Sequence, residues 1–258
     1  MTVPLDSHRA VVIGAGGAIG GAIGHAYAEA GATVWAADVD MTSVEVLTHA
    51  LGAGAHRASD VDVTDPASVE RLADAVWRDG PVDSVVYTAG VAFTASVADT
   101  DWPDYRRLMA VNVDGAFYVA GAFARRMLAA ERGGSFLFLS SMAGKRGEAG
   151  ASAYCASKFA LIGLTQSFAV EVAARGIRVN ALCPGNVDSP LLRRVARDVA
   201  RREGRAETNV YDDFARVAAA RRLVRPDEVA AVAVWLASPL ASAVTGEAIN
   251  VDAGALSG

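Results

Sequence analysis

The sequence has few cysteines, few histidines and no long apolar run. Its two cysteines, Cys155 and Cys183, are too few for a disulfide framework and form no C-x-x-C pair. We interpret both as reduced thiols, with Cys155 a candidate for partial reactivity. The four histidines lie at no metal-ligand spacing, and no segment approaches the about 18 uninterrupted apolar residues of a membrane span. With no basic-then-apolar leader at its start, we expect a cytoplasmic protein without metal or membrane contacts.

Lysine is also scarce, because Lys145 and Lys158 are the only two among 24 basic residues and the other 22 are arginines. These arginines are scattered along a chain of formal net charge -5, rather than clustered in a basic arm. That pattern excludes the electrostatic footprint of a nucleic-acid binder. In a chain so biased toward arginine, the lysine at position 158 needs an explanation.

Short apolar runs alternate with stretches of helical periodicity. The runs are 9–16, 32–38, 82–90, 134–141 and 177–185, and the expected helices are about 18–30, 42–51, 66–78, 102–130 and 152–175. Continuous apolar runs are typical of strands buried on both faces. The alternation predicts an α/β fold with a Rossmann-type, doubly wound parallel sheet, in one domain over residues 1–258.

One polar segment, about 189–222, interrupts the pattern with nine arginines against five acidic residues. We interpret it as a solvated helical pair, with an anion-binding lid as the alternative.

The first expected strand runs into "GAGGAIGGAIG", which fits G-x-x-x-[G/A]-x-G through Gly14, Ala18 and Gly20. Such a turn lets backbone N–H groups approach a pyrophosphate at a helix N-terminus, although a tight turn without a ligand would look the same. Asp38 ends the second run, where a carboxylate accepts hydrogen bonds from ribose hydroxyls and repels a 2′-phosphate. The alternative role for Asp38 is helix capping. We expect NAD rather than NADP.

Tyr154 and Lys158 are four residues apart in one expected helix, so they project from the same face. A nearby ammonium stabilises a phenolate and is expected to lower the pKa of Tyr154 from its usual value of about 10. Ser141 lies 13 residues before Tyr154, at the end of an expected strand, where open parallel sheets bind ligands. An ordinary amphipathic helix face would explain an isolated Tyr-x-x-x-Lys pair equally well.

With these residues together, the chain resembles the short-chain dehydrogenase/reductase family over nearly its whole length. The resemblance implies a catalytic set of Ser141, Tyr154 and Lys158, completed through a water relay by the asparagine of "RLMAVNVDGAFYVA", Asn112. Other matching pieces are "DVTD", "TAG", "PGNVDS" and "TGEAINVDAG". The chain departs from the family's usual residues at Ile13, Thr88, Ser189 and Ala253. None of these departures removes a proton-transfer group.

The resemblance also implies two sets of binding residues. Cofactor contacts are expected at Gly14, Gly17, Ala18, Ile19, Gly20, Asp38, Asp62, Val63, Thr88, Ala89, Gly90, Tyr154, Lys158, Pro184, Gly185, Val187 and Ser189. Substrate contacts are expected at Ser141, Met142, Tyr154, Asn186 and Leu191.

The implied reaction is hydride transfer between NAD and a secondary alcohol or its ketone. A polyol or sugar alcohol is the favoured substrate. If it is phosphorylated, Arg193, Arg194 and Arg197 are candidates to contact the phosphate when the lid folds inward, and surface solvation explains these arginines equally well. A diketone, a hydroxyketone, a cyclic ketone and a 3-ketoacyl group stay open as alternatives, as does a catalytically silent NAD-sensing scaffold. Helices that are apolar around much of their circumference, together with the resemblance, imply a homotetramer.

Overall fold

A computed structural model describes residues 4–52 and 54–256 of the chain. In this part of the chain seven parallel strands form one sheet, in the order β3-β2-β1-β4-β5-β6-β7. The strands are β1 (Arg9–Ile13), β2 (Thr33–Asp38), β3 (Arg57–Asp60), β4 (Ser84–Tyr87), β5 (Gly134–Leu139), β6 (Ile177–Pro184) and β7 (Ala248–Val251). The predicted doubly wound parallel sheet is confirmed. The ends of the predicted domain, residues 1 and 258, lie outside the described residues.

Two of these strands, β3 and β7, were not predicted. Both lie at the edges of the sheet, and their residues are half-buried or exposed. An edge strand is only partly covered, so it lacks the continuous apolar run by which the central strands were recognised.

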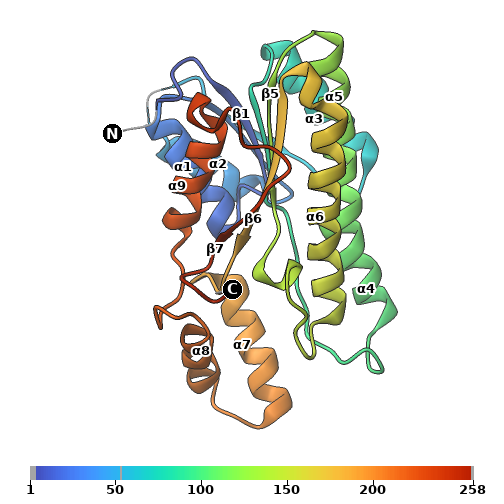
Figure 1. Cartoon of the computed structure of the whole chain (residues 1–258), viewed down its shortest axis with the longest axis vertical. Coiled ribbons are helices and arrows are strands. Elements are labelled where there is room, and N and C mark those ends of the chain that lie inside the picture. The colour runs from blue at the N-terminus through green and yellow to red at the C-terminus, as the bar shows by residue number, and fades with distance from the viewer. Residues whose placement is uncertain (1–3, 53, 257–258) are drawn as a thin grey trace.

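Helices cover both faces of the sheet (Figure 1). One face carries α1 (Ala18–Glu29), α2 (Met41–Ala50) and α9 (Pro226–Ala237), and the other carries α3 (Pro66–Asp79), α5 (Gly115–Ala129) and α6 (Ser152–Val172). Alternate residues of β1 enter different cores: Val11 and Ile13 pack on the α3, α5 and α6 side, and Ala10 and Val12 on the α1 and α9 side. Burial on both faces explains why the central strands are apolar without alternation.

The helix predicted over about 102–130 is confirmed in its extent, with one interruption that was not predicted. The segment forms α4 (Trp102–Met109), a π-helical turn (Ala110–Asp114) and then α5. The turn places Asn112, which is fully buried, with its side chain bonded to the backbone of Val91 on the neighbouring loop. Apolar periodicity runs through both halves, so it carries no sign of this interruption.

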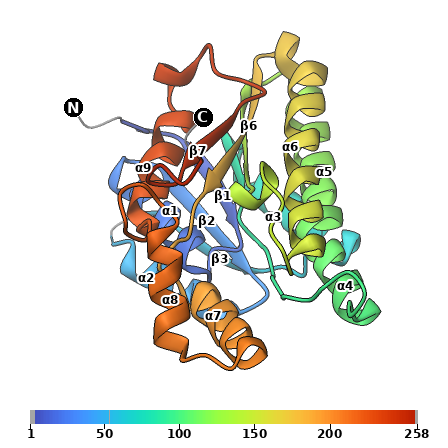
Figure 2. The same cartoon turned by 60° about the horizontal axis from the view of Figure 1, so that its bottom comes forward.

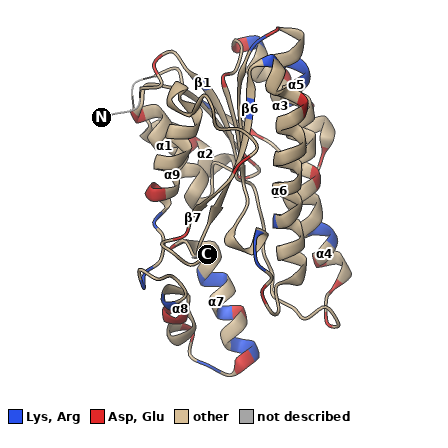
Figure 3. Ribbon diagram, in the orientation of Figure 1, with Lys and Arg blue, Asp and Glu red and all other residues tan. Residues whose placement is uncertain are grey.

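The segment after β6 forms a helical hairpin at the carboxyl end of the sheet (Figure 2). Ser189 caps α7 (Pro190–Glu203) by accepting a hydrogen bond from the Leu192 N–H, and α8 (Glu207–Arg216) packs back against it. Small side chains, Ala196 and Ala200, meet Val210 between the two helices. Positive and negative side chains intersperse along both (Figure 3), as predicted for a solvated helical pair.

Candidate active site

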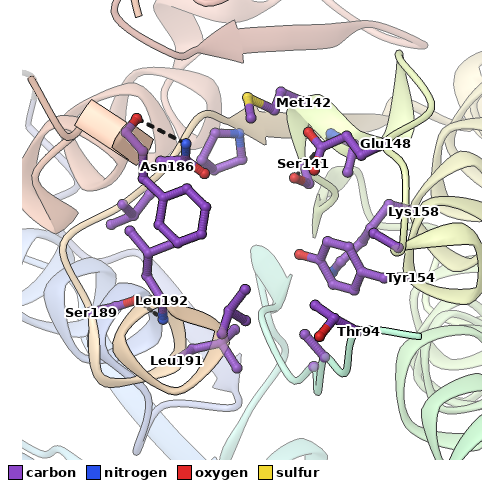
Figure 4. Close-up of a pocket in the computed structure, with 18 of the residues that line it drawn as sticks. Thr94, Ser141, Met142, Glu148, Tyr154, Lys158, Asn186, Ser189, Leu191 and Leu192 are labelled. Atoms are coloured by element: carbon purple, nitrogen blue, oxygen red, sulfur yellow. Dashed lines mark hydrogen bonds between the residues drawn. The ribbon is translucent and has the colours of Figure 1, made fainter. Parts of the chain in front are cut away.

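Ser141, Tyr154 and Lys158 line a single cavity of about 340 Å³ beside the carboxyl end of the sheet (Figure 4). Ser141 follows β5 and begins a short 3-10 helix (Met142–Gly144), where its Oγ accepts a hydrogen bond from the Ala143 N–H at 3.1 Å. Tyr154 and Lys158 lie one turn apart on α6, as their spacing predicts. The bond to Ala143 uses an acceptor position of Ser141 and leaves its hydroxyl proton available to the cavity.

Lys158 is only 3% exposed, and its ammonium donates a hydrogen bond to the Leu139 carbonyl at 2.8 Å. Burial lowers the pKa of Lys158 to about 8, and Cys183 opposes this shift. The ammonium nitrogen lies 5.6 Å from the centre of the Tyr154 ring. The lysine therefore sits beneath the tyrosine, with its charge already directed at a backbone oxygen of β5.

The predicted lowering of the Tyr154 pKa is wrong for the residues described here. Burial raises the pKa of Tyr154 to about 12, with the Ser141 hydroxyl opposing the rise and Glu148 adding to it. Loss of water from around the hydroxyl is the largest cause of this rise in the pKa. At neutral pH the chain by itself holds Tyr154 in its protonated form.

Asn112 does not line this cavity in the described structure, yet it fixes the cavity's wall. Its Oδ1 accepts from the Val91 N–H at 2.9 Å, and its Nδ2 donates to the Val91 carbonyl and to Ser157 Oγ, both at 3.0 Å. Ser157 in turn donates to the Tyr154 carbonyl at 2.7 Å. The Asn112 side chain thus links the loop after β4 to the turn of α6 that carries Tyr154.

The glycine-rich turn borders a second cavity of about 410 Å³. Gly14 has φ +84°, and a Cβ there would lie 2.4 Å from the Ala89 nitrogen; a Cβ at Gly20 would lie 2.2 Å from the Gly14 carbonyl oxygen. Helix α1 begins next to Gly17, and no described side chain caps its N-terminus or places an acidic group in its first turn. The turn therefore requires glycine for packing, and its free N–H groups fit an anionic pyrophosphate.

The two cavities share the lining residues Thr88 and Gly90, so they are adjacent. The predicted cofactor residues on the second cavity are Gly14, Gly17, Asp38, Asp62, Val63 and Ala89, and those on the first are Ile19, Tyr154, Lys158, Pro184, Gly185, Val187 and Ser189. Of the described set, Ala18 and Gly20 line neither. Gly20 instead lets α1 pack closely on Gly14 and Thr88.

Asp38 lies at the end of β2, where its Oδ2 accepts from the Gly16 N–H at 2.9 Å and its Oδ1 from the Asp40 N–H at 3.1 Å. Asp40 caps α2 through Ser43, so helix capping is not the role of Asp38. Arg107, which sequence reasoning missed, lines the same cavity. It comes from α4, 69 positions along the chain, and no local motif marks it.

Comparisons with known proteins agree with this geometry. Residues 14–255 match a short-chain dehydrogenase family model described as enoyl-(acyl carrier protein) reductase. Sorbitol dehydrogenase of Cereibacter sphaeroides is 34% identical over 97% of this chain and 98% of its own, and D-threitol dehydrogenase of Mycolicibacterium smegmatis is 37% identical over 97% and 93%. The chain belongs to the short-chain dehydrogenase/reductase family.

A solved short-chain dehydrogenase/reductase from Mycobacterium marinum has the same fold, with a TM-score of 0.89 and 30% identity over 99% of this chain and 98% of that one. Membership makes the protein an oxidoreductase that acts on CH–OH groups and uses a nicotinamide cofactor. The two adjacent cavities, one with the uncapped N-terminus of α1 and the other with Tyr154, fit such a dinucleotide.

The predicted substrate residues of this dehydrogenase, Ser141, Met142, Tyr154, Asn186 and Leu191, all line the first cavity. Leu191 enters from α7, and the Asn186 amide donates to the Phe214 carbonyl at 3.0 Å (Figure 4). Among the lining residues that were missed are Thr94, Glu148 and Arg202. They come from two loops and from α7, so only the folded chain brings them together.

Two of the arginines considered for a phosphate pair with acidic side chains in the structure. Arg193 pairs with Asp188 at 3.0 Å and lies over the Tyr211 ring, and Arg197 lies 3.7 Å from Glu207. Among the arginines of the described chain, Arg202 alone lines the cavity. For Arg193 and Arg197 the surface role, the alternative given above, agrees with this arrangement of α7 and α8.

Both cysteines are buried free thiols whose pKa values are raised by burial. The thiolate is the reactive form, so this burial argues against the partial reactivity expected of Cys155. Within residues 4–52 and 54–256, no group of three or more His, Cys, Asp or Glu side chains is placed to hold a metal ion. Nor is any helix of the described chain long and apolar enough to cross a membrane.

Proposed function

We propose that this enzyme interconverts a secondary hydroxyl of an unphosphorylated polyol and the corresponding ketone, with NAD as its cofactor. One observation carries the proposal: Ser141, Tyr154 and Lys158 meet in a cavity that shares two lining residues, Thr88 and Gly90, with the cavity along the glycine turn. The names of the sorbitol and D-threitol dehydrogenases support a polyol substrate.

Proton transfer is the task of Tyr154. In ketone reduction its protonated hydroxyl, favoured by burial, donates to the substrate oxygen, and in alcohol oxidation it takes the proton back. Ser141 donates a hydrogen bond to the same oxygen, where negative charge develops. NAD, when bound, supplies the hydride acceptor and a positive charge that favours the tyrosinate.

Two further residues support Tyr154 and Ser141: Lys158 toward the cofactor, and Asn112 toward the loop after β4. The Lys158 ammonium uses one proton on the Leu139 carbonyl, which leaves two donors for the ribose hydroxyls of the cofactor. The Asn112 amide spends both of its donor hydrogens on Val91 and Ser157. We therefore assign Asn112 to positioning the loop after β4, with a relay water left to backbone groups of the π-helical turn.

The preference for NAD rests on Asp38. Its carboxylate lies on the second cavity, at the end of β2, with both oxygens held by backbone N–H groups. A carboxylate fixed in this way accepts hydrogen bonds from ribose hydroxyls and repels a 2′-phosphate. Arg107 is the opposing feature, since it adds a cation to the same cavity.

We also propose a homotetramer. Helices α5 and α6 lie side by side on the outer face of the molecule in both views (Figures 1 and 2). They expose Phe117, Phe159 and Val170 by 54%, 47% and 83%. Large apolar side chains gathered on two neighbouring helices support a subunit interface there.

Sorbitol, D-threitol and galactitol, each offered with NAD and separately with NADP, test the function by the absorbance of the reduced cofactor. We expect turnover of at least one polyol with NAD. Tyr154→Phe should still bind NADH while its kcat falls by orders of magnitude, because the proton is lost and the ring is kept. The proposal fails if no polyol is oxidised, or if the Phe variant turns over normally.

A further inference from the structure

One carboxylate of the substrate cavity has no role in the chemistry described above. Glu148 lies between the 3-10 helix and α6, and it lines the cavity together with Ser141, Met142 and Tyr154. Figure 4 shows Glu148 and Ser141 on the same side of the cavity. The loop is held in place because the Ala151 N–H donates to the Glu148 carbonyl at 3.1 Å.

The Oε1 atom of Glu148 is buried and accepts no hydrogen bond from the described residues. The other two buried side-chain atoms without a partner there belong to Arg9 and Arg178, which are not among the residues of this cavity. Burial also raises the pKa of the Glu148 carboxyl, with Arg146 opposing the rise. A buried acceptor without a donor is costly, and a hydroxyl entering the cavity would remove that cost.

The nearby cation does not neutralise this group. Arg202 lines the same cavity, but its guanidinium lies against Gly150. In the described part of the chain, Glu148 takes part in no ion pair. A carboxylate left in this state attracts hydroxyl donors and repels phosphate or carboxylate groups.

We propose, given the polyol oxidation proposed above, that Glu148 is the residue by which the cavity recognises a polyhydric alcohol. Its carboxylate accepts a hydrogen bond from a second hydroxyl of the substrate, while Tyr154 and Ser141 engage the hydroxyl that is oxidised. Met142 and Leu191 are apolar members of the same cavity lining. A monohydric alcohol would leave the carboxylate unsatisfied, so the site selects neutral polyols over alcohols with a single hydroxyl.

The test compares D-threitol with butan-2-ol, which has the same four-carbon skeleton and one hydroxyl. In Glu148→Gln and Glu148→Leu, the ratio of kcat/KM for D-threitol to kcat/KM for butan-2-ol should fall by about 10- to 100-fold, the range for a hydrogen bond to a charged group. Butan-2-ol should be oxidised at least as well as by the wild type. Most of the loss should lie in KM for the polyol, because the lost bond is made in the bound substrate as well as in the transition state.

Two controls separate recognition from folding. NADH fluorescence should show unchanged cofactor affinity in both variants, and Glu29→Gln, which alters an exposed carboxylate at the end of α1, should leave the ratio unchanged. An enzyme that oxidises D-threitol with the same ratio in the wild type and both variants overturns the role of Glu148 alone. A wild type that oxidises no polyol overturns the proposed function and this inference together.

Discussion

At the scale of single residues, the site is built from groups that the protein holds in unfavourable states. Lys158 carries a charge in a place without water, and Tyr154 has its pKa raised by the same burial. Glu148 has a buried oxygen without a donor. Each of these groups would have a lower free energy in solvent. Each also faces the region where substrate and cofactor are proposed to bind. This is the usual signature of a site organised for binding rather than for stability.

The buried charge of Lys158 lowers the stability of the folded protein by an amount that depends on pH and can be measured. Because burial lowers its pKa from 10.5 to about 8, the unfolded chain holds a proton that the folded chain has released between these two values. The stability contribution of this group therefore rises as pH increases from about 8 to 10.5. The free energy of unfolding of the wild type should gain on the order of 2–3 kcal/mol relative to Lys158→Met over that range.

Urea titrations at a fixed protein concentration and several pH values measure this difference. Lys145→Met, which removes the other, exposed lysine, controls for the loss of a lysine as such. A constant difference between wild type and Lys158→Met from pH 7 to 10.5 would contradict the buried-charge interpretation.

Asp38→Asn tests the choice of cofactor at one atom. The amide oxygen can still accept from the Gly16 N–H, so the glycine turn is kept while the negative charge is removed. The ratio of kcat/KM with NAD to kcat/KM with NADP should fall on the order of 10-fold, mainly through a lower KM for NADP. Asp60→Asn, at the exposed end of β3, is the matched control, and an equal change in both variants would rule out a specific role for Asp38.

At the scale of elements, capping and turn residues explain where helices begin and end. Ser189 and Pro190 begin α7, and Gly176, with φ +73°, ends the extension of α6 as predicted from the sequence. The π-helical turn around Asn112 has no such local signal, and the Asn112 side chain is bonded to Val91 on another segment. Local residues therefore account for these two helix ends, and the interruption coincides with a long-range hydrogen bond.

Ala253 departs from the family pattern in the turn after β7, and this departure should lower the free energy of unfolding by a measurable amount. Ala253 has φ +52° in the turn after β7, a backbone conformation that disfavours any side chain and for which the family pattern has glycine. Ala253→Gly should raise the free energy of unfolding by about 0.5–1 kcal/mol, after the greater flexibility of unfolded glycine is taken into account. Kinetic constants should not change.

Thermal and urea unfolding measure this change. Ala50→Gly, at the exposed end of α2, offers the opposite case, since glycine in a helix lowers stability. If Ala253→Gly is as destabilising as Ala50→Gly, the turn is not strained.

At the scale of the whole molecule, the outer face formed by α5 and α6 exposes large apolar side chains that no other part of the chain covers in the described structure. Phe159 on α6 and Phe117 on α5 are about half exposed, while the inner sides of both helices already pack on the sheet. Covering this face with another copy would remove apolar area from water. The site itself lies at the other side of α6, against Ser141 and β5.

Phe159→Glu should weaken this proposed interface, because association would bury a charge without a partner. Sedimentation of the wild type should give about four times the chain mass of 26.6 kDa, and the variant should give smaller species at the same concentration. Val46→Glu, an equally drastic change at an exposed position on α2, should leave the mass unchanged. A wild-type protein that sediments only as a monomer would contradict the tetramer.

The sequence by itself determined the parallel sheet, the glycine turn and the alignment of Tyr154 with Lys158, because each leaves a pattern in residues close together in the chain. Tertiary structure decided what depends on segments far apart. It raised rather than lowered the pKa of Tyr154, turned Arg193 and Arg197 toward acidic partners, and added Arg107 and Glu148 to the two cavities. Burial and long-range partners set charge and protonation, and neither can be read from local spacing.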